Sequence, residues 1–234
     1  MKSLPRLELG APAQRLSEVG GARMQRVVIL WVLSWMVLAS GALLVCGDGR
    51  CSEIQFDRVG LGAAHDLRNQ SLDHLMVGVT WLGSLMLLLP LTGLRAWYLF
   101  RKGLRRESAF IMLALLSASA IGHLAKLWVA RPRPELFAAW LPMPEDWSYP
   151  SAHAMQITAA ALALFLVSTR RHAIWAAALG LVVAAVGLSR IYLQVHFPSD
   201  VIAGTLASAL WAGGLYALIF GRASRPGQGR GGAV

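Results

Sequence analysis

Long apolar stretches constrain the fold of this chain more than any other feature. Of its 234 residues, 56% are hydrophobic and 15% are charged, a composition typical of membrane proteins. Because the bilayer core offers backbone groups no water, a stretch of about 20 apolar residues crosses it as a helix. Six stretches approach that length: Val27–Val45, His74–Leu94, Ser108–Ala125, Ser151–Thr169, Ala173–Ser189 (extended by Ile191–Val195) and Val201–Gly221. The expected fold class is all-α, a polytopic membrane protein with six transmembrane helices.

The six stretches predict one membrane domain over residues 27–221. It is preceded by an arm (1–26) and followed by a tail (222–234) rich in Gly and Arg, which we expect to be disordered. Pro90 is expected to kink the second span. Three small residues of the last span, Gly204, Ser208 and Ala212, share one helix face. This pattern predicts close packing against another helix.

Basic residues predict the orientation. They are concentrated in the arm, after the second and fourth spans and in the tail, so both termini are expected on the cytoplasmic side of a bacterial-type inner membrane. The loop 47–73 is mixed in charge and expected outside, with a short external helix that places Ile54, Val59 and Leu61 on lipid. The formal charge of +10 is attributed to topology and anionic lipids, because the basic face of a soluble nucleic-acid-binding domain is missing.

The two cysteines, Cys46 and Cys51, follow the first span on the expected outer side. An oxidising compartment permits a disulfide there. Their spacing alone leaves a bridge and two free thiols equally open, because a bridge also needs the right Cβ geometry.

Three short polar clusters interrupt the apolar chain: Lys126–Pro134, Pro150–His153 and Ser189–Asp200. Ionisable groups at membrane depth indicate function by default, because burying them is costly. The orientation inferred from loop charges makes no use of these residues. It nevertheless places all three clusters on the outer side of the membrane.

The cations of these clusters are suited to binding a phosphate. Arg133 and Arg190 present planar forks and Lys126 a compact charge. Ser151 opens a helix, so the free backbone N–H of Ala152 and the helix dipole form an anion site. Phosphoryl transfer needs mainly such positioning and charge stabilisation.

The two histidines and the aspartate supply the groups for covalent catalysis. His196 and Asp200 are four residues apart, so Asp200 can accept a hydrogen bond from one ring nitrogen and leave the other free to attack. His153 remains as proton donor to the leaving group and then as base for water.

Each side chain also has a purely structural explanation. Long cations anchor helices at the interface, and Ser and Asp cap helix N-termini; these explanations apply to Lys126, Arg131, Arg133, Ser151 and Asp200. They do not explain why His153 and His196 lie at the same depth.

The clusters resemble the three signature motifs of the type 2 phosphatidic acid phosphatase family, the membrane branch of a superfamily shared with vanadium haloperoxidases. The resemblance covers roughly residues 73–221. Lys126, Arg133 and Pro134 match K-x6-R-P. Pro150, Ser151 and His153 match P-S-G-H, with Ala152 in place of glycine. The motif S-R-x5-H-x3-D is matched in full by Ser189, Arg190, His196 and Asp200.

The resemblance implies a helical-bundle core and a role for each matched residue. His196 would form a phosphohistidine, Asp200 would orient it and His153 would protonate the leaving group. The phosphate would be bound by Lys126, Arg133, Ser151, Ala152 and Arg190. No metal or cofactor is expected. Alanine at position 152 costs little in helical geometry, but it would impair activity if the turn required a positive φ.

The leading hypothesis is a metal-independent lipid phosphate or pyrophosphate phosphatase with its site at the periplasmic (outer) face. Candidate substrates are undecaprenyl pyrophosphate, phosphatidylglycerol phosphate, phosphatidic acid and a lipid A phosphate. A phosphotransferase using the same site and a catalytically silent lipid-binding or transport protein are the alternatives. The expected partners are the lipid substrate and membrane lipids, with no nucleic acid; the oligomeric state stays open.

Overall fold

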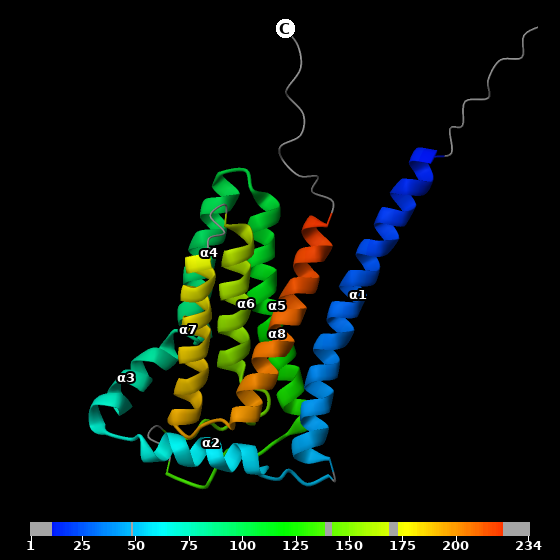
Figure 1. Cartoon of the computed structure of the whole chain (residues 1–234). Coiled ribbons are helices and arrows are strands. Elements are labelled where there is room, and N and C mark those ends of the chain that lie inside the picture. Colours follow the sequence, from blue (N-terminus) through cyan, green and yellow to red (C-terminus); the bar gives the residue numbers. More distant parts are fainter. Residues whose placement is uncertain (1–10, 48, 139–141, 169–172, 222–234) are drawn as a thin grey trace, which may run out of the picture.

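The computed structural model describes residues 11–47, 49–138, 142–168 and 173–221, and every regular element in these ranges is an α-helix. The long helices run side by side in one bundle (Figure 1). The helices are α1 (Ala11–Cys46), α2 (Gln55–Asp66), α3 (Gln70–Trp81), α4 (Leu85–Arg101), α5 (Arg105–Val129), α6 (Ala152–Val167), α7 (Ala173–Tyr192) and α8 (Pro198–Phe220). The all-α prediction is confirmed.

Several helices are long and apolar enough to cross a membrane. By length and composition, α5, α7, α8 and the Gly21–Cys46 part of α1 each qualify. The pair α3 and α4 qualifies only as one span bent by 45°. The shorter α6 has 16 residues. A multi-pass membrane protein is therefore supported, while the count of six spans stays a prediction.

The bend in the second predicted span lies between α3 and α4, at residues 82–84, whereas Pro90 lies inside α4. The bend that the structure shows thus precedes Pro90, and a kink at Pro90 itself stays a prediction. Gly83 explains the location, because a Cβ there would lie 2.5 Å from the Val186 side chain and 3.2 Å from that of His153. The bend therefore lies at a residue without a side chain, which allows the end of α3 to pack closely against α6 and α7.

Helix α6 is the central helix and contacts α4, α5, α7 and α8. It is apolar on all sides, as a helix enclosed by others must be. The small-residue face of α8 packs against it: a Cβ on Gly204 would lie 3.0 Å from the Ser151 carbonyl oxygen, and Ser208 Oγ donates to the Met155 carbonyl at 2.7 Å. The predicted close packing is confirmed, and it fixes where α6 begins.

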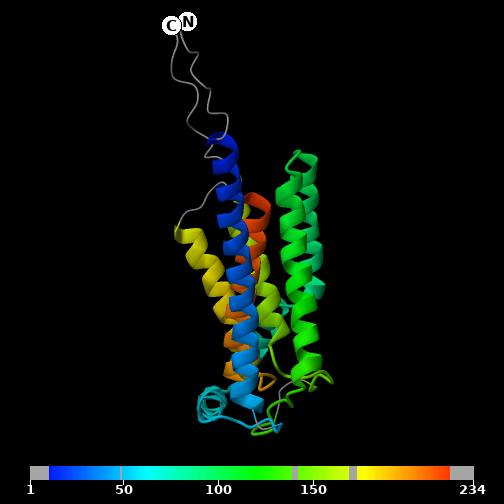
Figure 2. The same ribbon diagram turned by 90° about the vertical axis from the view of Figure 1, so that its right-hand side faces the viewer.

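Helix α1 packs along α8 in both views (Figures 1 and 2). Ser34 Oγ donates to the Ala207 carbonyl at 2.8 Å, and the Trp31 and Trp211 rings stack at 4.8 Å. Residues 11–26 continue α1 as one helix instead of forming a separate segment. Residues 1–10 of the predicted arm and the predicted tail lie outside the described residues.

Helix α2 lies across the end of the bundle where α1 ends and α8 begins (Figure 1). The predicted short helix in this loop is confirmed, while its place outside the membrane stays a prediction; its predicted rotation was partly wrong. Phe56 and Val59 are 54% and 62% exposed, whereas Leu61 and the Asp57 side chain are fully buried. The carboxylate of Asp57 turns inward because a buried arginine, Arg131, pairs with it at 2.8 Å.

A disulfide joins Cys46, the last residue of α1, to Cys51. It closes the loop that leads into α2, and the Ser52 N–H donates to the Val45 carbonyl at 2.8 Å. The spacing left a disulfide and two free thiols open, and the structure contains the disulfide.

Candidate active site

The three polar clusters come together at the end of the bundle that α2 crosses (Figure 1). At this end α5 and α7 stop and α6 and α8 begin. The predicted side chains lie in these terminal turns and in the loops that join them: Lys126, Arg133, Ser151, Ala152, His153, Arg190, His196 and Asp200. Four helices therefore position one site.

His196 lies in the loop between α7 and α8, and its side chain is 2% exposed. Its Nδ1 is 3.4 Å from Asp200 Oδ2, and its Nε2 is 3.3 Å from Arg133 Nη1. A carboxylate accepts hydrogen bonds and a guanidinium donates them. The proton therefore belongs on Nδ1, and the lone pair of Nε2 faces the cations.

Burial lowers the pKa of His196 well below its usual value of 6.5, and the charges of Arg133, Arg190 and Lys126 lower it further. The ring is therefore neutral at pH 7, which is the form a nitrogen nucleophile requires. The same three charges create a strongly positive environment around Nε2, suited to an anion.

Lys126 and Arg133 share one carboxylate, that of Asp146. Lys126 Nζ lies 2.8 Å from Oδ2, and Arg133 Nη2 pairs with Oδ1. Burial alone would raise the pKa of Asp146, but the hydrogen bonds and charges of the two cations outweigh it and lower this pKa to about 2. The Asp146 side chain is 47% exposed, whereas those of Lys126 and Arg133 are 3% and 7% exposed. The Asp146 carboxylate thus lies on the solvent side of both cations.

Arg190 lies in the last turn of α7 and is buried. Its Nη1 donates to Thr80 Oγ1 at 2.7 Å, while its buried Nε has no hydrogen-bond partner among the described residues. Buried donors are normally paired, so this N–H is suited to an oxygen of a ligand. Thr80, in the last turn of α3, was not predicted.

The start of α6 has the geometry expected of an anion site. Ser151 is the N-cap and its Oγ accepts from the Ala154 N–H at 3.5 Å. Ala152 is the first helical residue, and the described non-glycine residues with positive φ are Ala130 and Gln194. Alanine in place of the family glycine therefore causes no backbone strain here.

His153, one residue further along α6, is partly exposed. A Cβ on Gly83 would lie 3.3 Å from its Cδ2 atom, so the bend between α3 and α4 packs directly against the imidazole. The bend thus borders the site, although the sequence indicated no role for it.

Asp200 also caps α8, as its structural explanation suggested. Its Oδ2 accepts from the Phe197 N–H at 3.0 Å and from Ser148 Oγ, and it is the atom nearest His196. Its Oδ1 accepts from Arg131 Nη1 at 2.7 Å. The two explanations of Asp200 are therefore compatible.

The explanation of Arg131 as an interfacial anchor was wrong. Its side chain is 1% exposed and lies between the carboxylates of Asp57 and Asp200. The one available signal was the repeat R-P-R-P, which sets Arg131 two positions before Arg133. Asp57 and Asp146 carry no comparable signal.

Comparisons with known proteins agree with the motifs. Residues 107–224 match the model of the PAP2 superfamily. The undecaprenyl-diphosphatase of Sulfolobus acidocaldarius is 35% identical over 141 residues, which cover 58% of this chain and 65% of that protein. The phosphatidylglycerophosphatase B of Bacillus subtilis is 31% identical over 150 residues, covering 61% and 72%. The chain thus spans slightly under two thirds of the Sulfolobus protein.

Two solved structures have the same fold. The transmembrane PAP2 type phosphatidylglycerolphosphate phosphatase of Bacillus subtilis superposes with a TM-score of 0.65 at 25% identity, covering 82% of this chain and 95% of that one. Aquifex aeolicus LpxE gives a TM-score of 0.58 at 26% identity, covering 71% and 96%. The family match, the relatives and the shared fold together establish that the chain belongs to the PAP2 superfamily.

Proposed function

We propose that this PAP2 protein hydrolyses the phosphate or pyrophosphate group of a membrane lipid through a phosphohistidine on His196. The observation that carries the proposal is the environment of this ring. His196 is buried and neutral, its Nδ1 faces Asp200, and its Nε2 faces Arg133. A nucleophile beside preorganised cations is what phosphoryl transfer requires.

In the first step, His196 Nε2 attacks the phosphorus and the bond to the lipid oxygen breaks. His153 supplies the proton that the leaving oxygen needs. In the second step, water attacks the phosphohistidine while His153 takes a proton from it. The P–N bond then breaks, phosphate leaves and His196 is regenerated. Asp200 holds the Nδ1 proton and stabilises the positive charge on the ring in the intermediate.

The phosphate oxygens are bound by Lys126, Arg133, Arg190 and the start of α6. In this arrangement the substrate replaces the carboxylate of Asp146, which now pairs with Lys126 and Arg133. The unpaired Nε of Arg190 gains an acceptor. These groups need no metal to offset the phosphate charge.

The names of the relatives support a lipid substrate. By name they act on an undecaprenyl diphosphate, a phosphatidylglycerol phosphate and, in Mycobacterium tuberculosis, decaprenylphosphoryl-5-phosphoribose. Undecaprenyl pyrophosphate and phosphatidylglycerol phosphate are therefore the first substrates to test, followed by phosphatidic acid and a lipid A phosphate.

We place the site at the outer face of a bacterial-type cytoplasmic membrane. The disulfide lies at the same end of the bundle as the site, which suits an oxidising compartment. The α4–α5 turn at the opposite end carries four cations, as cytoplasmic loops do: Arg101, Lys102, Arg105 and Arg106.

The test is phosphate release by the purified full chain in detergent with EDTA present, measured on each of the four lipids. We expect release from at least one lipid and its loss in His196→Ala. A variant that releases phosphate at the wild-type rate contradicts the proposed nucleophile. A wild-type protein inactive on every lipid contradicts the proposed hydrolysis.

A further inference from the structure

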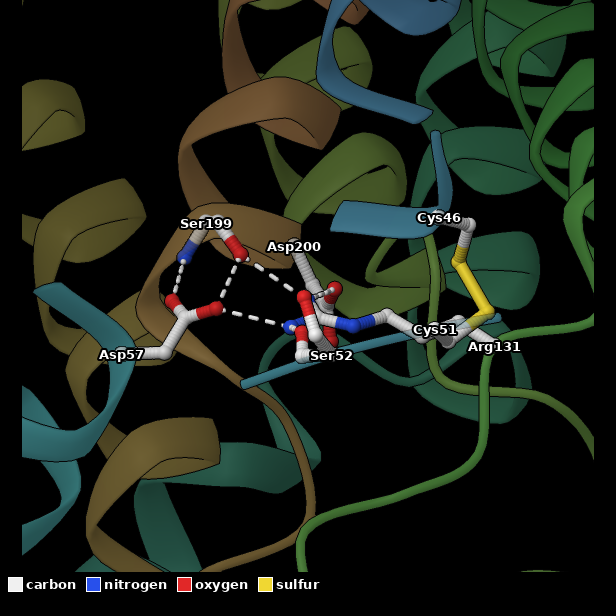
Figure 3. Close-up of a disulfide and its surroundings, with 7 residues drawn as sticks. All are labelled: Cys46, Cys51, Ser52, Asp57, Arg131, Ser199 and Asp200. Carbon is white, nitrogen blue, oxygen red and sulfur yellow. Dashed lines mark hydrogen bonds and ion pairs between the residues drawn. A yellow bond between two sulfur atoms is a disulfide. The ribbon is translucent and has the colours of Figure 1, made fainter. Parts of the chain in front are cut away.

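A second group of charges lies on the Nδ1 side of His196, where Asp200 is, whereas Nε2 faces Arg133. Arg131 Nη1 donates to Asp200 Oδ1 at 2.7 Å, and its Nη2 donates to Asp57 Oδ2 at 2.8 Å (Figure 3). The side chains of all three are at most 1% exposed. One guanidinium thus joins a carboxylate of the surface helix α2 to the carboxylate that faces His196.

Ser199 closes this group. Its backbone N–H donates to Asp57 Oδ1 at 2.9 Å, and its Oγ donates to Asp57 Oδ2 at 2.8 Å (Figure 3). Arg131 Nη1 donates to the same Oγ at 2.9 Å. Because Ser199 directly precedes Asp200, Asp57 holds both the arginine and the backbone next to the catalytic aspartate.

Two further contacts restrict the guanidinium. Its Cζ lies 3.7 Å from the centre of the Phe197 ring, and Nη2 also donates to the Ser52 carbonyl at 3.2 Å. Ser52 follows Cys51, so the disulfide anchors the segment that carries this acceptor (Figure 3). Little freedom is left for Arg131 to turn toward a ligand.

The arrangement explains how a fully buried aspartate is paired with a cation and held in one orientation. A carboxylate loses hydration on burial and needs a paired cation to remain ionised. Arg131 supplies that cation at Oδ1, which leaves Oδ2 directed at His196 Nδ1. Without the Asp57 carboxylate, the guanidinium would lose the ion pair at Nη2, and a small shift of Arg131 would move Asp200 with it.

We infer that Arg131 and Asp57 are positioning residues of the His196–Asp200 pair: the fork of Arg131 fixes Asp200, and Asp57 anchors that fork from α2. This inference rests on the proposed function of His196. It predicts that Arg131 and Asp57 affect the rate at which His196 is phosphorylated. They should not affect the binding of phosphate, which involves the cations on the Nε2 side of the ring.

The experiment compares Asp57→Asn and Arg131→Gln with Asp66→Asn, a matched acid-to-amide change on the exposed part of α2. Asp57→Asn tests the anchor without changing side-chain shape. It should lower kcat and phosphohistidine formation about 10- to 100-fold, the effect of a small misplacement of a reacting group. KM and the inhibition constant of inorganic phosphate should stay within threefold. Asp66→Asn should match wild type.

Asp57→Glu, which keeps the charge, should recover most of the lost rate. Folded fraction is checked for every variant by gel filtration in detergent, and rates are taken per folded molecule. Wild-type kcat in folded Asp57→Asn overturns the inference, as does a loss confined to KM or to phosphate binding. If wild type itself releases no phosphate, the proposed function fails instead, and the two failures are thus distinguishable.

Discussion

Arg131 and Arg133 lie two positions apart in one loop, but their carboxylate partners differ in exposure to solvent. Arg131 lies between Asp57 and Asp200, and all three side chains are at most 1% exposed. Arg133 shares a carboxylate, Asp146, that is 47% exposed. A cation enclosed by buried partners cannot exchange them for a ligand, whereas one with a solvent-facing partner can. In the proposed mechanism, the first arrangement positions the nucleophile and the second receives the phosphate.

The largest expected difference is in stability. Arg131→Met leaves two buried carboxylates without their cation, which costs about 3–5 kcal/mol in the free energy of unfolding. Arg133→Met should cost less than about 1 kcal/mol, because its partner reaches solvent, yet phosphate release should fall at least about 100-fold. Unfolding in detergent and phosphate-release assays measure the two effects. Equal destabilisation by both variants would remove the distinction between the arginines.

Asp146→Asn tests whether the exposed carboxylate competes with phosphate. Removing the charge frees Lys126 and Arg133 to bind another anion. The inhibition constant of inorganic phosphate should therefore fall about tenfold, which corresponds to about 1.4 kcal/mol of binding free energy. Glu145→Gln, an exposed neighbour, is the control and should leave the constant unchanged. Weaker phosphate inhibition in Asp146→Asn would show instead that Asp146 holds the cations in place for the ligand.

Thr80→Val tests the support of Arg190, the third cation. The hydroxyl of Thr80 accepts from Arg190 Nη1 at 2.7 Å, and its loss should lower kcat/KM about 3- to 10-fold, the effect of one hydrogen bond to a charged group. Thr92→Val is the matched control, since the buried Thr92 hydroxyl donates to its own helix at 2.6 Å. The loss should be larger for Thr80→Val than for Thr92→Val, and equal losses would contradict the support of Arg190 by Thr80.

The smallest expected effect is on the pH dependence of stability. The pKa of Asp146 is lowered to about 2 in the folded protein from 3.8, so its ion pairs stabilise the fold above pH 3.8 and are lost as pH falls toward 2. The difference in unfolding free energy between wild type and Asp146→Asn should be constant from pH 8 to 5. It should stay below about 1 kcal/mol, because the Asp146 carboxylate is 47% exposed and solvent screens its charge. A difference that disappears near neutral pH would show that Asp146 is not held ionised by these cations.

The sequence predicted that the motif residues would lie at one end of the bundle, because these residues are tied to helix ends. Lys126 and Arg190 close helices, and Ser151 and Asp200 cap them. Hydrophobicity indicates where each span ends, and loop charge predicts the orientation of the spans. These two patterns were sufficient to bring eight residues to one end of a bundle.

What the sequence did not predict depends on tertiary contacts. Nothing local shows that Asp57 on an amphipathic surface helix points inward, because a charge on such a helix normally faces water. The bend at residues 82–84 depends on Gly83 meeting Val186 and His153 from distant helices. Pro90 was the stronger local signal, but it lies near the start of α4, where the helix continues across it.

The most direct test of the account is the chemical identity of the reaction intermediate. Wild type and His196→Ala are mixed for milliseconds with a lipid carrying labelled terminal phosphate, quenched at alkaline pH, and digested for mass spectrometry. The account predicts label on His196 in wild type, formed no more slowly than turnover, and none in the variant. A wild type that turns over lipid with no labelled residue, or with the label elsewhere, would contradict it.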